Sequence, residues 1–385
     1  MSRILLVPSA FYPSLGGVEE IARNLATELM KQHLDVKVAV NRHPQELPEK
    51  QDLFDVEVHR FNFYYPKRSI EEVFRLPMVL QGLSKFNSFL KNWQPNVVHI
   101  ICPSSAALYV YFLRKFLRFK ILVTFQGELF MDANMIYDKS ALIRFGLRKL
   151  LSIADGVTAC SDYVLADVRR KYKINHAIQK VIFNGVDLDE SQEDNAADFS
   201  LQKEYIFALG RLVHNKGFDV LIKAFQLIAS AYPDIELIIA GDGIEQKNLE
   251  NIIKSGGLTD RIRLVGRKNR AEVGAYFRDC AFFVLPSPVE PFGIVCLEAM
   301  RAGKAIIATE SGGPPEFIEG GKDGLLVTPN DATALSEAMD RLLSNPELRS
   351  KMGDSCRRKV ARFSWREITK EYILIYEKMY LNPAN

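Results

Sequence analysis

The stretch Glu290-Pro291-Phe292-Gly293-Ile294-Val295-Cys296-Leu297-Glu298 is the most informative part of this 385-residue chain. It follows an apolar segment typical of a buried strand (residues 281–285), and it opens an apolar helix that runs to Gly303. Pro near the first helical position and Gly just past the last are usual helix boundaries. The start of such a helix attracts phosphate, and two carboxylates can accept hydrogen bonds from hydroxyl groups. A nucleotide sugar carries both kinds of group, although a surface-loop Glu followed by an ordinary helical Glu would give the same pattern.

Two basic residues stand at the end of another predicted strand. Gly210-Arg211 directly follows the strand at residues 205–209, and Lys216-Gly217 precedes the next helix. Arg binds phosphate oxygens bidentately, and Lys supplies a compact positive charge. Together they suit a pyrophosphate, which favours the nucleotide-sugar interpretation of the two Glu residues.

Paired glycines occur at two further strand ends. Gly16-Gly17 separates a strand at residues 4–7 from a helix at residues 18–31, and Gly312-Gly313 follows a strand that begins at Ala305. Glycine lets the backbone approach a ligand closely, although a strand-Gly-helix turn is also common without a ligand. The evidence for a ligand-binding site is therefore the order of all these segments along the chain, rather than any one segment alone.

Apolar segments of strand length alternate with helical segments, which predicts an α/β protein with doubly wound, mostly parallel sheets. The first half holds six predicted strands, at residues 4–7, 36–40, 97–101, 121–125, 156–159 and 181–183. The second half holds six more, at residues 205–209, 235–240, 262–265, 281–285, 305–308 and 324–327. Between the halves, residues 188–203 are polar, acidic and without pattern, as in a linker. We predict two Rossmann-like domains, residues 1–187 and 204–364.

In this order the segments resemble the motifs of the retaining glycosyltransferases of family four (glycosyl transferases group 1), which have the GT-B fold. The resemblance spans nearly the whole chain and rests on Gly16-Gly17, Asn184-Gly185-Val186-Asp187, Gly210-Arg211 with Lys216-Gly217, Glu290 with Glu298, and Gly312-Gly313 with Glu316. It implies two Rossmann-like domains that face a central cleft, the first on the acceptor side and the second holding the donor. It also implies that a last helix, residues 365–385, returns to pack on the first domain.

The resemblance also implies roles for individual residues. Glu290 would hold hydroxyls of the transferred sugar, and Glu298 those of the ribose. Arg211 and Lys216 would stabilise the departing diphosphate, and with Glu290 they are the expected catalytic residues. Transfer would retain the anomeric configuration, and backbone near Arg267 would read the base, for which we expect uracil with another base left open. The other expected donor-binding residues are Gly16, Gly17, Gln126, Asn184, Gly210, Arg267, Phe292, Gly293, Ile294 and Val295.

One segment departs from the family pattern. After the strand at residues 121–125, many relatives carry a His that faces the donor sugar, and this chain has Gln126. A Gln amide can donate to a sugar hydroxyl but cannot carry a proton. Glu128, two positions further on, is then a candidate contact for the sugar or for the acceptor. His99 is expected to be a hydrogen-bonded histidine at a strand end.

The chain shows no convincing Asp-x-Asp pair at a strand end, where a divalent ion for sugar transfer is typically held. Asp187-Leu188-Asp189 matches the Asp-x-Asp pattern but belongs to the turn into the predicted linker. Arg211, Lys216 and the helix amides can take the place of the metal at the leaving group. We therefore expect a metal-independent transferase whose nucleotide-sugar donor is a co-substrate and which uses no cofactor.

Charge divides unevenly along a chain whose net charge is +3. Residues 1–180 carry 25 Lys and Arg against 17 Asp and Glu, and the basic residues gather in 111–120 (YFLRKFLRFK) and 139–149 (KSALIRFGLRK). Because aromatic and Leu residues are interleaved with them, these segments suit an anionic lipid surface; a solvated helix face is the alternative. No reader motif for nucleic acid accompanies them. The expected acceptor is a glycan, lipid-linked or small-molecule hydroxyl.

Composition is that of a globular protein, with 48% hydrophobic and 25% charged residues, and the length suits two α/β domains. Five scattered cysteines without a C-x-x-C pair favour reduced thiols in a cytosol. No signal peptide or membrane span is recognisable. We expect a cytoplasmic protein, free or at the inner face of the membrane. Two other functions stay open, namely a hydrolysing nucleotide-sugar epimerase of the same fold and a non-catalytic nucleotide-sugar-binding subunit.

Overall fold

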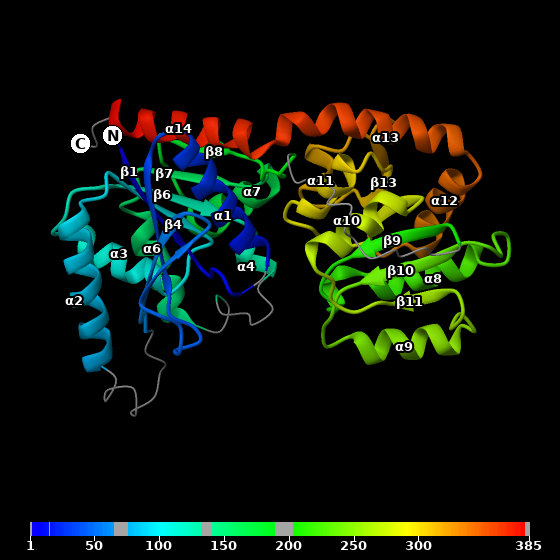
Figure 1. Ribbon diagram of the computed structural model, residues 1–385, viewed down its shortest axis with the longest axis horizontal. Coiled ribbons are helices and arrows are strands. Elements are labelled where there is room, and N and C mark those ends of the chain that lie inside the picture. Colours follow the sequence, from blue (N-terminus) through cyan, green and yellow to red (C-terminus); the bar gives the residue numbers. More distant parts are fainter. Residues whose placement is uncertain are drawn as a thin grey trace. The chain divides into compact units, whose positions relative to one another are not determined.

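The computed structural model describes residues 2–14, 16–64, 76–131, 137, 140–188 and 203–381. It divides into two compact units, each built around its own sheet (Figure 1). Unit 1 comprises Met1–Asn184 and Trp365–Asn385, and unit 2 comprises Gly185–Ser364. Most of the predicted linker, residues 189–202, lies outside the described residues.

Among the described residues of unit 1, the sheet has eight strands in the order β3-β4-β2-β1-β5-β6-β7-β8. All neighbouring pairs are parallel except β3 with β4. The central strands are apolar almost throughout because helices cover both faces of a parallel sheet. The strands are β1 (Arg3–Pro8), β2 (Asp35–Asn41), β3 (Lys50–Leu53), β4 (Val56–Phe61), β5 (Val97–Ile101), β6 (Lys120–Phe125), β7 (Gly156–Ala159) and β8 (Gln179–Val181).

The prediction of six strands in the first half is wrong, because it omits β3 and β4. The sequence of β3 is KQDL, exposed or half-buried along its whole length, and in β4, VEVHRF, polar residues interrupt the apolar ones. A polar edge strand lacks the apolar run from which strands are predicted in a sequence, and its charges hinder pairing with other chains. The strand predicted at residues 181–183 begins and ends two residues earlier, as β8.

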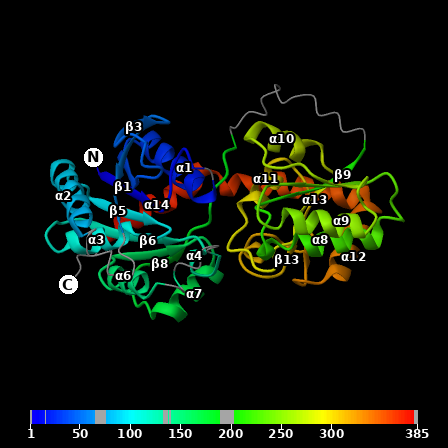
Figure 2. The same cartoon turned by 90° about the horizontal axis from the view of Figure 1, so that it is seen from below.

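Helices cover both faces of this sheet. α1 (Gly17–Lys31) packs against α14 (Trp365–Leu381), and α3 (Ala106–Arg114) packs against α2 (Leu76–Trp93) and α6 (Ala141–Leu151) (Figures 1 and 2). Because crossovers between parallel strands are right-handed, α1 and α3 lie on opposite faces of the sheet. The helices are α1 (Gly17–Lys31), α2 (Leu76–Trp93), α3 (Ala106–Arg114), α4 (Glu128–Met131), α6 (Ala141–Leu151), α7 (Asp162–Tyr172) and α14 (Trp365–Leu381). None of the described helices is long and apolar enough to cross a membrane.

The last helix, α14, contributes to the core of unit 1. Tyr372 and Tyr376 are buried, and the Tyr376 hydroxyl lies 2.8 Å from Nδ1 of His99. The other ring nitrogen of His99 lies 2.6 Å from Oγ1 of Thr124 on the adjacent strand. Burial lowers the pKa of His99 to about 3, so its ring is neutral at physiological pH. The expected hydrogen-bonded histidine is confirmed, although it lies inside β5 rather than at its end.

In the described part of unit 2, the sheet has six strands in the order β11-β10-β9-β12-β13-β14, and every pair is parallel. Each matches a predicted strand, with ends that differ by one residue at most. The strands are β9 (Tyr205–Leu209), β10 (Glu236–Ala240), β11 (Ile262–Leu264), β12 (Phe282–Leu285), β13 (Ile306–Thr309) and β14 (Gly324–Val327).

Successive residues of β9 face different layers of unit 2. Ile206 and Ala208 join the core that includes the inner faces of α8 and α12. Phe207 faces the other way and stacks on Tyr276 of α10, with ring centroids 5.3 Å apart. This alternation follows from the two-residue period of a strand. The helices are α8 (Phe218–Ile228), α9 (Gln246–Ser255), α10 (Arg270–Asp279), α11 (Ile294–Arg301), α12 (Ala332–Leu343) and α13 (Pro346–Val360), with short helices η2 (His214–Lys216), η3 (Pro314–Glu316) and η4 (Ala361–Phe363).

Candidate active site

The sheet of unit 2 has a switch point between β9 and β12. From β9 the chain proceeds outward to β10 and β11, and from β12 it proceeds the other way to β13 and β14. Ligands of open α/β sheets bind at the carboxyl ends of the strands at such a point. Gly210 follows β9, and its N–H donates to the carbonyl of Ala240 at 3.0 Å. Arg211 comes next, with an exposed side chain at the switch point.

A buried ion pair lies at this edge. Nζ of Lys216, the last residue of η2, is 2.6 Å from Oε2 of Glu290, which lies between β12 and α11. The two side chains are only 15% and 10% exposed. The Ser287 hydroxyl donates to the same Oε2 at 2.9 Å, and Oγ1 of Thr309 donates to the Ser287 carbonyl at 2.6 Å. The Glu290 carboxylate is therefore held in place before any ligand binds.

Glycines let the strand-end loops touch through their backbones. Gly217 has φ of +68°, and a Cβ there would lie 2.2 Å from the carbonyl oxygen of Pro286. Gly312 has φ of +86°, and a Cβ there would lie 2.1 Å from the carbonyl oxygen of Glu290. The Gly313 N–H donates to that same oxygen at 2.8 Å. The close approach expected of Gly312-Gly313 is thus made to the backbone of Glu290, whose position these glycines fix.

The start of α11 lies beside this ion pair in the chain. The helix begins at Ile294 after Gly293, whose φ of +90° is a conformation that glycine adopts readily. The first turn of a helix leaves backbone N–H groups without intrahelical acceptors, and these attract anions. Ile294, Val295 and Glu298 are half-buried. This helix start can therefore bind a phosphate through the N–H groups of its first turn.

Two predicted donor-binding residues of unit 2 have other partners. The ring of Phe292 is 2% exposed and packs against Phe317 with centroids 4.8 Å apart, so it belongs to the core. Arg267 follows β11 and forms an exposed ion pair with Asp242, with Nε 3.1 Å from Oδ2. The side chain of Phe292 therefore supports the fold. The side chain of Arg267 is oriented by its ion pair with Asp242.

In unit 1, Gln126 and Asn184 come together at the carboxyl edge of the sheet. Gln126 directly follows β6, and Nδ2 of Asn184 donates to its Oε1 at 2.9 Å. The backbone N–H of Gln126 donates to Oε2 of Glu128 at 2.7 Å. The Asn184 side chain is buried. Gln126 is thus held by its neighbours through both its side chain and its backbone.

Gly16 and Gly17 lie at the start of α1 and are exposed. The Ser14 hydroxyl donates to Oε1 of Glu19 at 2.7 Å. A Cβ on Gly16 would lie 2.8 Å from Oε2 of the same Glu19. This loop is therefore organised around the buried Glu19 carboxylate, a role that the sequence pattern alone does not indicate.

Ser287 and Thr309 were also missed as functional candidates. Both are buried, at 0% and 3% exposure, and together they brace Glu290. The available signal was weak, namely a Ser three positions before a predicted catalytic Glu and a Thr at the end of the neighbouring strand. Buried hydroxyl groups need partners, so these two residues indicate that Glu290 is positioned rather than free to rotate.

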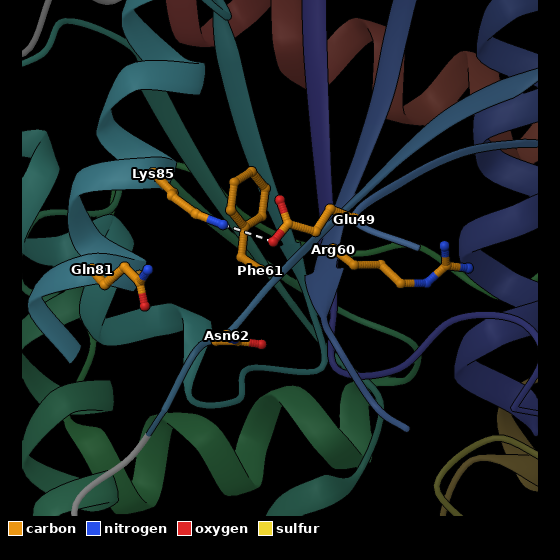
Figure 3. A pocket seen from close by; sticks show the side chains of 7 residues that line it. Glu49, Arg60, Phe61, Asn62, Gln81 and Lys85 are labelled. Atoms are coloured by element: carbon orange, nitrogen blue, oxygen red, sulfur yellow. Dashed lines mark hydrogen bonds and ion pairs between the residues drawn. The ribbon is translucent and has the colours of Figure 1, made fainter. Parts of the chain in front are cut away.

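A separate pocket in unit 1 lies between β4 and α2 (Figure 3). Across it, Nζ of Lys85 lies 2.7 Å from Oε1 of Glu49. The Arg60 guanidinium points away from Lys85 and donates to the carbonyl of Tyr12 at 3.0 Å. No predicted catalytic or donor-binding residue lines this pocket, so it is not part of the candidate active site. Its lining residues are Glu49, Arg60, Phe61, Asn62, Gln81, Gly82 and Lys85.

Comparison with known families assigns the chain. The family model described as "Glycosyl transferases group 1" matches residues 189–359, and the model "Glycosyltransferase Family 4" matches residues 15–190. The two matches follow one another and cover most of the chain. It belongs to the family-four glycosyltransferases. The predicted enzyme class is thereby confirmed, and it is favoured over the epimerase and the non-catalytic subunit.

Relatives and solved structures agree with this family-four assignment. An uncharacterized glycosyltransferase of Methanocaldococcus jannaschii is 27% identical over 97% of this chain and 98% of its own. The N-acetyl-alpha-D-glucosaminyl L-malate synthase of Bacillus anthracis is 26% identical over 97% of each chain. Sucrose-phosphate synthase from Thermosynechococcus elongatus, 22% identical, superposes with a TM-score of 0.80 over 99% of this chain and 100% of its own. Anabaena HepE in complex with UDP-glucose, 18% identical, gives 0.77 over 98% and 100%. The predicted fold, two parallel-sheet α/β domains of the GT-B type, is confirmed.

Proposed function

We propose that this glycosyltransferase moves a sugar from a UDP-linked donor to a hydroxyl acceptor, with retention of configuration and without a metal ion. The observation that carries the proposal is the Lys216–Glu290 ion pair at the switch point of unit 2, between Arg211 and the start of α11. Cationic groups and helix amides suit a diphosphate, and a fixed carboxylate suits sugar hydroxyls. The similar fold of HepE, solved with UDP-glucose, supports the choice of UDP.

In the proposed reaction, the bond between the anomeric carbon and the diphosphate oxygen breaks, and the acceptor oxygen bonds to the same face of that carbon. The proton of the acceptor hydroxyl passes to the departing diphosphate, so atoms and charge balance. Arg211 and Lys216 stabilise the negative charge that grows on the diphosphate. Glu290, held by Ser287, accepts hydrogen bonds from the sugar. Glu298, further along α11, accepts them from the ribose.

Transfer is expected to survive an excess of EDTA, because Arg211 and Lys216 supply the positive charge at the leaving group. The measurement is product formation from UDP-glucose and other UDP-sugars, assayed by mass spectrometry with glycan, lipid-linked and small-molecule acceptors. The anomeric proton coupling of the product, read by NMR, reports whether configuration is retained. Loss of transfer on chelation with rescue by magnesium or manganese would contradict metal independence, and an inverted product would contradict retention.

We further propose that α3, the residues just after it, and α6 form a docking surface for an anionic membrane that carries the acceptor. The two helices pack together, and a Cβ on Gly146 of α6 would lie 2.6 Å from the Leu108 side chain of α3. Arg114 does not belong to this surface, because it is half-buried with its guanidinium over the ring of Phe119. The exposed members of the α3–α6 surface are Phe112, Phe116, Leu142 and Phe145, with Lys115, Arg118, Arg148 and Lys149.

The protein is expected to sediment with phosphatidylserine-containing liposomes at low salt and to be released at high salt, because surface attraction is screened. Each Lys or Arg near such a surface contributes about 1 kcal/mol, so reversing all four basic residues of the α3–α6 surface to Glu should abolish binding. The matched control reverses four exposed basic residues of unit 2, Lys223, Lys322, Arg341 and Lys351. Unchanged binding of the α3–α6 variant, or wild type that stays in the supernatant at low salt, would refute membrane docking by this surface.

A further inference from the structure

Two buried polar atoms at the carboxyl end of β6 lack a hydrogen-bond partner among the described residues. They are Nε2 of Gln126 and Oε1 of Glu128. Leaving a buried donor or acceptor unsatisfied is costly, and most such atoms in folded proteins are paired. One donor and one acceptor left over on the same short loop therefore indicate a place where a ligand completes the hydrogen bonding.

The other polar atoms of these two side chains are already engaged. Nδ2 of Asn184 donates to Oε1 of Gln126 at 2.9 Å, which leaves Nε2 as the amide atom for a ligand. The Gln126 N–H donates to Oε2 of Glu128 at 2.7 Å, which leaves Oε1. A sugar hydroxyl both donates and accepts. Neighbouring hydroxyls of one sugar would satisfy both atoms at once.

The backbone around this loop holds the two side chains in place. Gly127 has φ of +96°, so the chain turns sharply between Gln126 and Glu128. Cys102, at the end of the adjacent strand β5, has φ of +56°, a conformation that is rare outside glycine. Burial raises the pKa of Glu128 to about 7, against hydrogen bonds from neighbouring backbone and the Cys102 thiol that lower it. The effect of burial on this pKa is therefore larger than that of the hydrogen bonds. The enclosed Glu128 carboxyl group has fewer hydrogen-bond donors around it than an ionised carboxylate needs.

We propose that Glu128, together with Gln126, binds hydroxyl groups of the transferred sugar and determines which sugar the enzyme accepts. The inference rests on the proposed function, in which the donor is a nucleotide sugar. Oε1 of Glu128 accepts a hydrogen bond from one hydroxyl, and Nε2 of Gln126 donates to the oxygen of that hydroxyl or its neighbour.

The test compares wild type with Glu128→Gln on UDP-glucose and on its four deoxy forms, which lack the hydroxyl at carbon 2, 3, 4 or 6. For UDP-glucose, the variant should lose about 10- to 100-fold in kcat/KM, the range expected for one hydrogen bond to a charged group. For the deoxy form that lacks the contacted hydroxyl, wild type and variant should be alike. The affinity for UDP, measured by calorimetry, should not change.

Equal losses with every donor and with UDP would show that Glu128 only supports the fold, and would overturn the inference. Unchanged kcat/KM of the variant on UDP-glucose would also overturn it while leaving the proposed function intact. Wild type that neither binds nor uses UDP-glucose would overturn the proposed donor and the inference together. These three results are distinguishable because the wild-type enzyme and UDP are measured in every series.

Asp155→Asn is the matched control, because Asp155 is a shielded carboxylate near the other end of β6, where it accepts from the Ile121 N–H at 2.8 Å. It should leave the discrimination between UDP-glucose and its deoxy forms unchanged. If circular dichroism shows that Glu128→Gln is unfolded, Glu128→Asp replaces it in the same comparison. The shorter side chain keeps the charge but withdraws the carboxylate, so the same loss of discrimination is expected. Retained discrimination in a folded Glu128→Asp protein would count against the inference.

Discussion

Replacing Arg211 with alanine is expected to lower kcat by at least about a hundredfold while leaving the free energy of unfolding nearly unchanged. Arg211 is exposed and directly follows β9 at the switch point of unit 2, so its loss removes charge without opening the core. Preorganised positive charge at a leaving group is among the largest single contributions to catalysis. Turnover of UDP-glucose checks the expected loss of kcat, and thermal unfolding of the same preparation checks that stability is unchanged.

The control for Arg211 is Arg341→Ala, which removes an exposed arginine from α12 of the same unit. It should leave both kcat and thermal unfolding at the wild-type values. A folded Arg211→Ala protein with near-normal kcat would mean that another group stabilises the leaving diphosphate.

Glu290→Gln is expected to reduce kcat by a similar factor, about a hundredfold, and also to lower the free energy of unfolding by about 1–3 kcal/mol. Gln keeps the shape of the side chain but leaves the shielded Lys216 ammonium without its anionic partner. The charge needed to orient Lys216 and to accept hydrogen bonds from the sugar is then missing. Steady-state transfer and urea unfolding measure the two effects separately.

A double-mutant cycle with Lys216→Met tests whether the pair acts as a unit. The combined variant should lose less activity than the product of the two single losses, because each single change already breaks the same interaction. Glu347→Gln is the control, since it breaks an exposed pair with Lys351 on α13, with Oε1 2.7 Å from Nζ. It should alter neither activity nor unfolding. Strictly multiplicative losses at positions 216 and 290 would show that the two residues act independently.

The sheet of unit 2 could be predicted because its strands are short apolar runs between turn residues. The sequences of β9 and β13, YIFAL and IIAT, are what a parallel strand covered on both faces requires. The edge strand β3 and its neighbour β4 could not be predicted, because they are held by pairing, β3 with β4 and β4 with β2, rather than marked by an apolar run. Pairing of that kind is not visible in a local pattern.

The residues of the candidate site could be proposed from the sequence, but the contacts between them could not. Arg211, Lys216 and Glu290 follow neighbouring strands, which was enough to place them at one edge. The 2.6 Å contact of Lys216 with Glu290 depends on the turn through Gly217, whose backbone lies against Pro286. Such contacts between distant loops follow from the packed fold, and spacing along the chain does not encode them.

The backbone contacts of the glycines also bear on how donor preference could be engineered or could evolve. A side chain at Gly217 or Gly312 would collide with a carbonyl of the neighbouring loop. Directed libraries should therefore leave these glycines unchanged. Ile294 and Val295 already carry side chains and are half-buried at the start of α11. Substitutions at Ile294 and Val295 can therefore change substrate choice between related enzymes while the glycines that position Glu290 stay the same.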